Sequence, residues 1–453
     1  MSNFEVNNQK SVELIQAEKP YASSYSRVSY YDAVFDHGKG ALLYDVDGNE
    51  YIDFLASASS CNTGHCHPKV VKAVQEQAEK LIQTTPAYMW HEPQIRLMER
   101  LAKLAPGNSP KRVSFGNSGS DAADAVLKLA RAYTGRPYMV SFEGSYHGST
   151  YGSLTLSALS LNMRRKMGPL VPGIYHIPYP DVYHNDVSGM DDEQIADHFM
   201  KPLLDMTSHY LPKEEIAGIF IEAVAGDLGI VPAHKRFMEK LYDFCQENGI
   251  LFCVDEVNQG LGRTGKMWSI DHYGIEPDLM TCAKSLASGL PLSAVIGKAD
   301  ILQSLGAPAN LFTTAGNPVT TAASLATLDV IEEEDLPGRS ERLGKHARER
   351  FEEMKEKYGV VSHVFGLGLN LGVEICDPET GEKDTAAALK ISTRAHQKGL
   401  VLITLNGSVL RVQPPLVITE EQLDKGLDII DSCMQELVEG KLPDDLVKGD
   451  RGW

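Results

Sequence analysis

The sequence predicts an α/β protein whose larger part is built on a mainly parallel sheet. From about residue 110 to about residue 320, short apolar runs alternate with segments of helical periodicity, which is typical of repeated βαβ units. After residue 325, a long charged helical segment precedes short strands. We therefore expect a large domain at residues 66–325 and a smaller α+β domain at 326–453, which the N-terminal residues 1–65 join.

The expected strands are apolar runs that stop at glycine-rich or polar turns. RVSF ends at GNSGS, where a helix begins that carries its apolar residues at helical spacing. A second helix stops at Gly249, a residue that favours helix C-termini. The expected helices cover 121–134, 233–248 and 332–359, and the expected strands cover 112–115, 137–142, 218–224, 250–257, 278–285, 370–375 and 409–418.

Composition and charge exclude several classes of function. The 453-residue chain has 43 basic and 61 acidic residues, a formal charge of −18 that argues against binding to nucleic acids or to anionic membranes. No signal peptide is apparent, and no stretch approaches the roughly 20 apolar residues needed to span a bilayer. Seven cysteines, an odd number in apolar contexts, suit reduced thiols, so we expect a cytoplasmic protein.

One glycine-rich stretch, DEVNQGLGRTGKMW, matches two phosphate motifs imperfectly. Gly260, Gly262 and Gly265 spell the dinucleotide fingerprint, but they lie late in the chain and no long helix follows them. The same stretch resembles a P-loop, but Met267 stands where Ser or Thr should hold magnesium. We reject both interpretations. The GHCHP run (64–68) has no second ligand pair at zinc-like spacing, so we interpret it as a structural turn and expect no metal.

A better-fitting set of residues lies at the ends of the predicted strands. Asp255 and Lys284 close two consecutive strands, and the carboxyl ends of parallel strands face a ligand crevice. GNSGS offers free backbone amides to an anion at the start of a helix, and Tyr146 adds an aromatic ring. The set suits pyridoxal phosphate: the lysine forms a Schiff base and the carboxylate keeps the ring nitrogen protonated. Taken singly, Asp255 could be a strand-end cap, Tyr146 a core residue and Lys284 a solvated side chain.

These motifs resemble the class III aminotransferase family of fold-type I pyridoxal-phosphate enzymes, from YDVDGNEYIDF to RVQPPLVI. The matching motifs are GHCHP, NSGSDA, SYHGST, IEAVAGDLG, DEVNQGLGRTGKMW, AKSLASGLPLSAV and TTAGNP. The resemblance makes Lys284 the Schiff-base lysine, Asp255 the partner of the ring nitrogen and Tyr146 the stacking ring. It places the phosphate at Gly119 and Ser120, and the other cofactor-binding residues that it implies are Ser118, His147, Glu222 and Asn258, the last standing where the family commonly has Gln.

The resemblance also implies an assembly of subunits. Thr314, in TTAGNP, matches the threonine that reaches the phosphate of the neighbouring subunit's cofactor. We therefore expect a homodimer or a dimer of dimers.

Family membership fixes the cofactor but not the reaction. Ser149 stands where aminotransferases acting on γ-aminobutyrate typically have an arginine that grips the distal carboxylate. Ala225 and Leu228 replace polar or small family residues in EAVAGDLG, which favours a non-polar substrate such as leucine, isoleucine, valine or methionine. The overall pattern resembles most closely the racemase and 2-epimerase members of the family.

Two roles for Asp227 remain open from the sequence. In the racemase members an aspartate at this position is thought to exchange a proton opposite the lysine, so Lys284 and Asp227 are the expected catalytic residues. Alternatively, Asp227 pairs with Arg411, the expected binding residue for the substrate carboxylate. We predict a pyridoxal-phosphate racemase or 2-epimerase of non-polar amino acids. The alternatives are a class III aminotransferase and, with least support, a non-catalytic relative.

Overall fold

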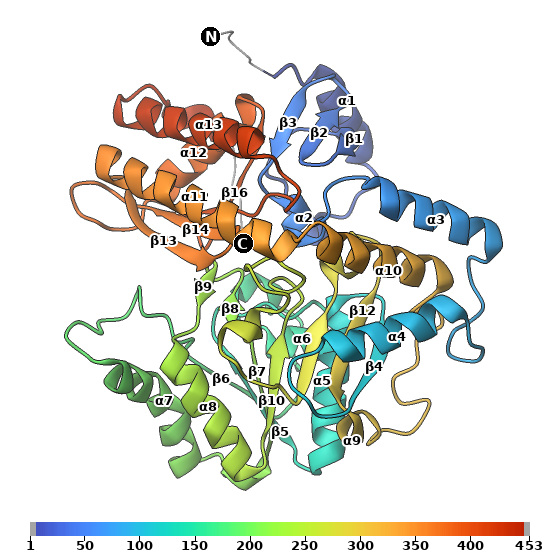
Figure 1. Ribbon diagram of the computed structural model, residues 1–453. Coiled ribbons are helices and arrows are strands. Elements are labelled where there is room, and N and C mark those ends of the chain that lie inside the picture. Colours follow the sequence, from blue (N-terminus) through green and yellow to red (C-terminus); the bar gives the residue numbers. More distant parts are fainter. Residues whose placement is uncertain (1–5, 448–453) are drawn as a thin grey trace.

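A seven-stranded sheet forms the centre of the computed structural model, which describes residues 6–447 (Figure 1). Its strands follow the order β4–β12–β11–β10–β7–β5–β6. All neighbouring pairs are parallel except those of β12, which is antiparallel to both β11 and β4. This confirms the mainly parallel sheet. In that order the strands are Lys111–Gly116, Ser293–Lys298, Leu279–Cys282, Leu251–Asp255, Ile216–Ile221, Tyr138–Phe142 and Ile174–Ile177.

Helices cover both faces of this sheet, which explains why its central strands β7, β10 and β11 are buried along their whole length. On β10, Leu251 and Cys253 pack with residues of α5 (Gly119–Thr134), whereas Phe252 and Val254 pack toward α8 (Lys235–Asn248). The other helices of this part of the chain are α3 (Pro68–Lys80), α4 (Glu92–Leu104), α6 (Tyr151–Leu156), α7 (Asp192–His209), α9 (Ala299–Leu302) and α10 (Pro318–Glu333).

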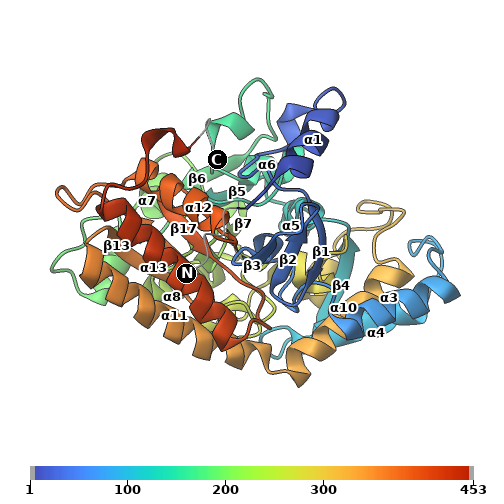
Figure 2. The same ribbon diagram turned by 90° about the horizontal axis from the view of Figure 1, so that it is seen from above.

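Two smaller sheets lie above the large one (Figure 1). One of them is antiparallel throughout and has the strand order β13–β14–β17–β16. In that order its strands are Val361–Leu367, Asn370–Ile375, Val409–Val412 and Ile403–Leu405. It lies with α11 (Leu336–Tyr358), α12 (Thr385–Gln397) and α13 (Glu420–Val438) (Figure 2).

The third sheet joins the two ends of the chain. Strands β1 (Phe35–Lys39), β2 (Leu42–Asp45) and β3 (Glu50–Asp53) form a meander, and β15 (Leu400–Val401) pairs in parallel with β3. The domain limits at residues 65 and 325 stay a prediction. The remaining elements are α1 (Gln9–Glu18), α2 (Ala56–Ser59), β8 (Val224–Ala225) and β9 (Val231–Pro232).

Two predicted elements differ from the structure, each for a local reason. The single helix expected at 332–359 is interrupted: α10 ends at Glu333, and Asp335 caps α11 by accepting a hydrogen bond from the Gly338 amide. The strand expected at 409–418 stops at Val412, because Pro414 and Pro415 cannot donate backbone hydrogen bonds.

The glycine-rich turn of GLGRTG places a buried arginine. Arg263 is fully buried and donates to the carbonyl oxygens of Leu369 at 3.1 Å and Pro414 at 2.6 Å. It also donates to Ser59 Oγ at 3.0 Å and to Asn62 Oδ1 at 2.5 Å. The arginine thus connects the N-terminal segment, the large sheet and the C-terminal sheet.

The glycines of this turn are required by its geometry. Gly262 and Gly265 have φ angles of 89° and 94°, which disfavour residues with a side chain. A Cβ at Gly260 would lie 2.9 Å from both the Trp268 ring and the Glu256 carbonyl oxygen. The motif therefore serves the fold, and neither phosphate interpretation is needed to explain it.

The histidines of GHCHP have structural partners. His65 pairs with Asp53 at 2.7 Å, and His67 caps α3 and contacts Glu334 at 3.0 Å. Among residues 6–447, no group of three or more His, Cys, Asp or Glu side chains is arranged to hold a metal ion. The contacts of His65 and His67 agree with a structural turn at this position.

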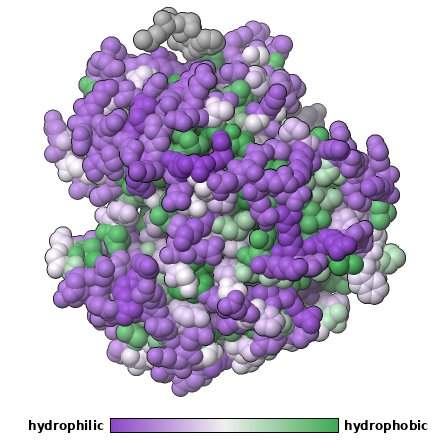
Figure 3. All heavy atoms as spheres, in the orientation of Figure 1, coloured by the Kyte–Doolittle hydropathy of each residue, from purple (hydrophilic) through white to green (hydrophobic). Residues whose placement is uncertain are grey.

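The surface seen in Figure 3 is mostly hydrophilic, with apolar atoms exposed in the hollow between the upper and lower parts of the molecule. Of the helices in the described chain, none is long and apolar enough to cross a membrane.

A histidine bridge joins the large sheet's loops to the C-terminal sheet. His184 contacts Asp181 at 2.6 Å and Glu374, on β14, at 2.8 Å. Hydrogen bonds to these two carboxylates raise the pKa of His184 to about 9. Burial opposes ionisation of Glu374, but hydrogen bonds from His184, Ser362 and Lys383 still lower its pKa to about 2. The bridge is therefore charged at neutral pH.

We predict that His184→Gln lowers the free energy of unfolding by about 2 kcal/mol at pH 6. Because the folded-state pKa lies above the ordinary value of 6.5, this contribution is complete below pH 6.5 and is lost as the pH rises through about 9. Denaturant unfolding at pH 6, 8 and 10 measures the difference, with the exposed His198→Gln as a matched control. A difference that does not vary with pH would contradict the assignment.

Candidate active site

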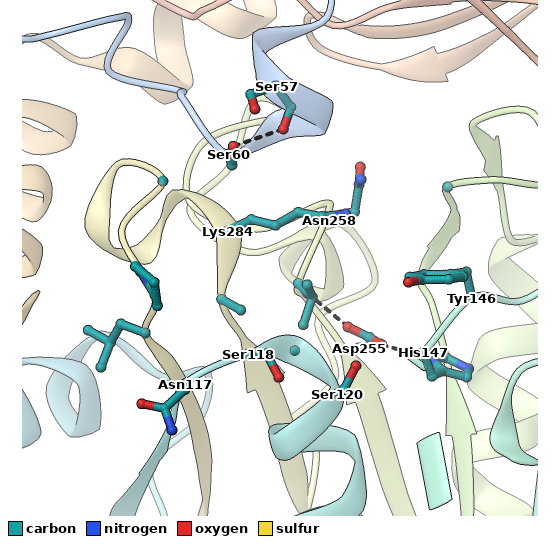
Figure 4. Close-up of a pocket in the computed structure, with 18 of the residues that line it drawn as sticks. Ser57, Ser60, Asn117, Ser118, Ser120, Tyr146, His147, Asp255, Asn258 and Lys284 are labelled. Atoms are coloured by element: carbon teal, nitrogen blue, oxygen red, sulfur yellow. Dashed lines mark hydrogen bonds and ion pairs between the residues drawn. The ribbon is translucent and has the colours of Figure 1, made fainter. Parts of the chain in front are cut away.

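A cavity of about 570 Å³ opens at the carboxyl ends of the central strands and the start of α5 (Figure 4). Ten of the twelve predicted site residues line it: Ser118, Gly119, Ser120, Tyr146, His147, Glu222, Asp227, Asp255, Asn258 and Lys284. The other two, the exposed Thr314 and the buried Arg411, contact residues that form this lining. The structure therefore brings the predicted set together.

The start of α5 offers backbone donors to an anion. Ser118 caps the helix by accepting from the Asp121 amide at 3.2 Å, and Asp121 in turn accepts from the amides of Asn117 and Ser118. The amides of Gly119 and Ser120 find no acceptor within residues 6–447. Two free amides at the positive end of a 16-residue helix suit an anion such as a phosphate, so the predicted role of Gly119 and Ser120 stays a prediction that this geometry allows.

Close packing explains the glycines of this cradle. A Cβ on Gly119 would lie 3.0 Å from Val257 Cγ1, which belongs to the opposite wall of the cavity. A Cβ on Gly148 would lie 2.3 Å from Ser120 Oγ, which accepts from the Ser149 amide at 3.0 Å. The cradle therefore has no room for side chains at these two positions.

Asp255 is held rigidly at the end of β10. Its Oδ1 accepts from the Val257 amide at 2.9 Å and from Thr281 Oγ1 at 3.0 Å, and its Oδ2 lies 2.7 Å from His147 Nδ1. Asp255 and His147 are both buried, and His147 Nε2 has no hydrogen-bond partner in the described part of the chain. The carboxylate is therefore fixed in orientation at the floor of the cavity (Figure 4).

Lys284 extends from the opposite wall (Figure 4). It follows β11 with φ 45°, a left-handed conformation that costs a residue with a side chain about 1–2 kcal/mol. Burial of the amine lowers its pKa, and the positive charge of Arg411 acts in the same direction. A lowered pKa enlarges the neutral fraction of the amine, which is the nucleophilic form.

Glu222 connects two loops that border the cavity. It accepts from the Tyr146 amide at 3.3 Å with one oxygen and from the Gly226 amide at 2.9 Å with the other. Burial raises the pKa of Glu222 to about 7. The Tyr146 hydroxyl lies 3.2 Å from Ser149 Oγ, so its ring is held at both ends beside the cavity.

Asn258, Arg411 and Asp227 form a polar cluster next to Lys284. With its oxygen turned toward the two cations, the Asn258 amide accepts from Lys284 Nζ and from Arg411 Nη2, each at 2.7 Å. Arg411 Nη1 pairs with Asp227 Oδ1 at 3.1 Å. Of the two roles considered for Asp227, the ion pair with Arg411 is the contact present in this structure.

Thr314 lies at the mouth of the site. Its Oγ1 donates to Asn117 Oδ1 at 3.1 Å, and Asn117 lines the cavity beside Ser118. Thr314 is otherwise exposed. Its predicted contact with a neighbouring subunit stays a prediction.

Several residues at the site escaped the sequence reasoning. Tyr30 is close enough to Asp227 and Arg411 for their charges to affect its phenol, whose pKa burial raises to about 12. Ala225 is buried in the core and Leu228 packs against Gly144, so neither lines the cavity as expected. The apolar lining comes instead from Val257, Leu290, Pro291 and Leu292. Ser57 and Ser60 form a small polar wall. Apart from Tyr30, these residues stand in or beside the motifs recognised in the sequence, and those motifs were the signal that could have identified them.

The residues present fit pyridoxal phosphate. Two unpaired amides, a fixed carboxylate, an aromatic ring and a buried amine surround one cavity, and they match the phosphate, the ring nitrogen, the ring face and the aldehyde respectively. An open α/β sheet that carries these amides, this carboxylate, this aromatic ring and this amine at the ends of its strands defines a fold-type I pyridoxal-phosphate enzyme.

Comparison with known proteins gives the family. The chain belongs to the class III aminotransferases: the family model described as "Aminotransferase class-III" matches residues 24–434. Isoleucine 2-epimerase of Lentilactobacillus buchneri is 54% identical over 446 residues, covering 98% of this chain and 99% of the relative. Leucine/methionine racemase of Thermococcus litoralis is 40% identical, covering 97% and 99%.

A solved structure supports the fold and the cofactor. An ornithine aminotransferase from Toxoplasma gondii, with pyridoxal phosphate at partial occupancy in its active site, superimposes with a TM-score of 0.83 at 27% identity, covering 97% of each chain. The cofactor of this enzyme is therefore pyridoxal 5′-phosphate.

We predict that Lys284→Ala abolishes the covalent link between cofactor and chain. In the wild type, borohydride reduces this imine to a stable secondary amine. Mass spectrometry of reduced, digested protein should find the cofactor on Lys284 in the wild type and nowhere in the variant. Lys266→Ala, in the rejected P-loop-like motif, serves as the control and should keep the link. Cofactor attached to another lysine in the wild type would refute the role of Lys284.

Proposed function

We propose that this enzyme interconverts the two configurations at Cα of non-polar amino acids, acting as a racemase or 2-epimerase. The observation that carries the proposal is that Lys284 and Asp227 line one cavity and both lie at the Arg411–Asn258 cluster. An inversion at Cα needs two proton-transfer groups on opposite faces of the substrate. The similarity to an isoleucine 2-epimerase and a leucine/methionine racemase supports the same activity.

Each polar group then has one task. Bound pyridoxal phosphate supplies an electron sink that acidifies the Cα proton of an attached amino acid. Lys284 Nζ accepts that proton on its own face, and the Asp227 carboxyl group delivers a proton to the opposite face; the reverse direction exchanges the two roles. Arg411 binds the substrate carboxylate through the Nη1 edge of its guanidinium, which pairs with Asp227 in this structure.

The cavity lining favours an uncharged, branched side chain. Leu290, Pro291 and Leu292 supply apolar surface, and Ser149 offers no positive charge to a distal carboxylate. Isoleucine is therefore the first substrate to test, followed by leucine, valine and methionine.

One observation favours a second candidate, an aminotransferase. The pair between Asp227 and Arg411 is formed at 3.1 Å, which is the arrangement expected if the aspartate only covers the arginine until a substrate arrives. Asp255 stabilises the charge developed in either reaction, so the cofactor site does not distinguish the two.

We also propose a homodimer or a dimer of dimers in the cytoplasm. The segment between α3 and α4 exposes Ile82, Tyr88, Met89 and Trp90, the last with 84% of its surface accessible, and such a patch favours burial against a second subunit. All seven cysteines, each within the described residues, are free thiols, which suits a reducing compartment.

The reaction is tested by incubating purified holoenzyme with L-isoleucine in deuterated water, with and without 2-oxoglutarate. We expect D-allo-isoleucine carrying deuterium at Cα, formed without any oxo acid and resolved by chiral chromatography. A 2-oxo product that appears only with 2-oxoglutarate would instead establish an aminotransferase.

The role of Asp227 is tested by Asp227→Asn, which keeps the shape but cannot exchange a proton. We expect racemisation to fall at least about 100-fold, as is typical for loss of an acid–base group. Exchange of the L-substrate's Cα proton with solvent at Lys284 should fall much less. Asp227→Glu is the matched variant that restores a carboxyl group. Unchanged racemisation by Asp227→Asn would leave the aspartate only its pairing role.

A further inference from the structure

We propose that Gln413 is a positioning residue that fixes Arg411 in place, so that an arriving substrate carboxylate displaces Asp227 and leaves the arginine where it is. The inference rests on the proposed role of Arg411 in carboxylate binding. It adds a residue, Gln413, to which the proposed function gives no role.

Arg411 is held on all sides inside the protein. Its Nε donates to Gln413 Oε1, its Nη2 to the Asn258 oxygen and its Nη1 to Asp227. Arg411 is 3% exposed and Gln413 is completely buried. Arg411 also belongs to β17, whose backbone is paired on both edges with β14 and β16. The arginine therefore has little freedom to move.

Gln413 is itself anchored by a chain of buried amides. Its Nε2 donates to Asn370 Oδ1, and Asn370 Nδ2 donates to Gln259 Oε1. Asn370 and Gln259 are both completely buried. Arg411 Nε–H can only donate, so its partner on Gln413 must be the oxygen Oε1, and turning the Gln413 amide would set Nε2 against Nε. The orientation of Gln413 Oε1 toward Arg411 is thus fixed.

Asp227 is held much more weakly. It lies in the turn between β8 and β9, it lines the cavity, and its side chain is 13% exposed against 4% for Arg411. Within residues 6–447, the contact with Arg411 is the only hydrogen bond that its carboxylate accepts. Displacing Asp227 breaks one ion pair that the incoming carboxylate replaces, whereas displacing Arg411 would leave the buried Gln413 Oε1 without its donor.

This difference couples binding to proton transfer. A substrate carboxylate that takes the Nη1 edge of Arg411 releases Asp227 into the cavity, where the proposed reaction needs an acid. Because Gln413 keeps the Nε edge, the guanidinium cannot follow Asp227. The enzyme therefore frees its second proton-transfer group only when an α-carboxylate is bound.

Carboxylate binding tests the role of Gln413 without any turnover. The probe is 3-methylpentanoate, the carbon skeleton of isoleucine without its amine, titrated calorimetrically into the holoenzyme. We expect Gln413→Leu to raise the dissociation constant about ten- to hundredfold, since a hydrogen bond to a charged group is lost. Gln259→Leu, the same substitution at the far end of the amide chain, should change it much less. Equal effects of the two variants would overturn the proposal.

Kinetics and a crystal structure complete the test. With L-isoleucine, Gln413→Leu should raise KM and leave kcat close to that of the wild type; a loss in kcat alone would argue for a merely structural role. If the leucine variant does not fold, Gln413→Asn, which shortens the amide, is measured in its place. In crystals of wild-type holoenzyme with 3-methylpentanoate, Arg411 should stay on Gln413 with Asp227 turned away, and an arginine that has left Gln413 would overturn the proposal.

The binding measurement separates this inference from the proposed function. If the wild type binds the carboxylate in the expected manner but forms no D-allo-isoleucine, the reaction class is wrong while the role of Gln413 stands. If D-allo-isoleucine forms and Gln413→Leu binds the carboxylate as the wild type does, only the present inference fails.

Discussion

The buried guanidinium of Arg263 is the contact on which the site's geometry depends. From the large domain it donates to acceptors in two other parts of the chain: Ser59 and Asn62 near the N-terminus, and the carbonyl oxygens of Leu369 and Pro414 in the C-terminal part. Burial lowers the pKa of Arg263 to about 9, so the hydrogen bonds must offset a large desolvation cost. Ser57 and Ser60, which line the cavity, stand next to Ser59 and Asn62, so the glycine-rich turn that places Arg263 also holds this wall of the cavity.

Most of the fold and most of the site followed from local patterns. Asp255 and Lys284 could be placed together because each closes an apolar run, and parallel strands end at one edge. The antiparallel direction of β12 was not foreseen. A strand that is buried on both faces is apolar throughout, and such a pattern does not indicate the direction of the strand. Gln413 was missed because its importance lies in partners distant along the chain, Asn370 and Gln259, which no local spacing reveals.

Asp227 illustrates how one contact can serve two chemistries. The ion pair with Arg411 orients the carboxylate at the edge of the cavity. To protonate Cα in the proposed reaction, Asp227 must leave this partner and turn toward the substrate. The same pair in an aminotransferase would simply shield the arginine. The distinction between isomerase and transferase thus depends on where this side chain lies when the substrate is bound, more than on which residues are present.

The pairing of β3 with β15 has a consequence for how the enzyme is made. Ile52 lies beside Leu400, so the N-terminal meander stays incomplete until nearly the whole chain has left the ribosome. The acceptors of Arg263 at Leu369 and Pro414 are also synthesised late. The central sheet, by contrast, contains only residues between Lys111 and Lys298. The order of synthesis therefore favours folding of the central sheet before the C-terminal sheet that carries Arg411, and pairing between residues far apart in the chain makes this last step slow.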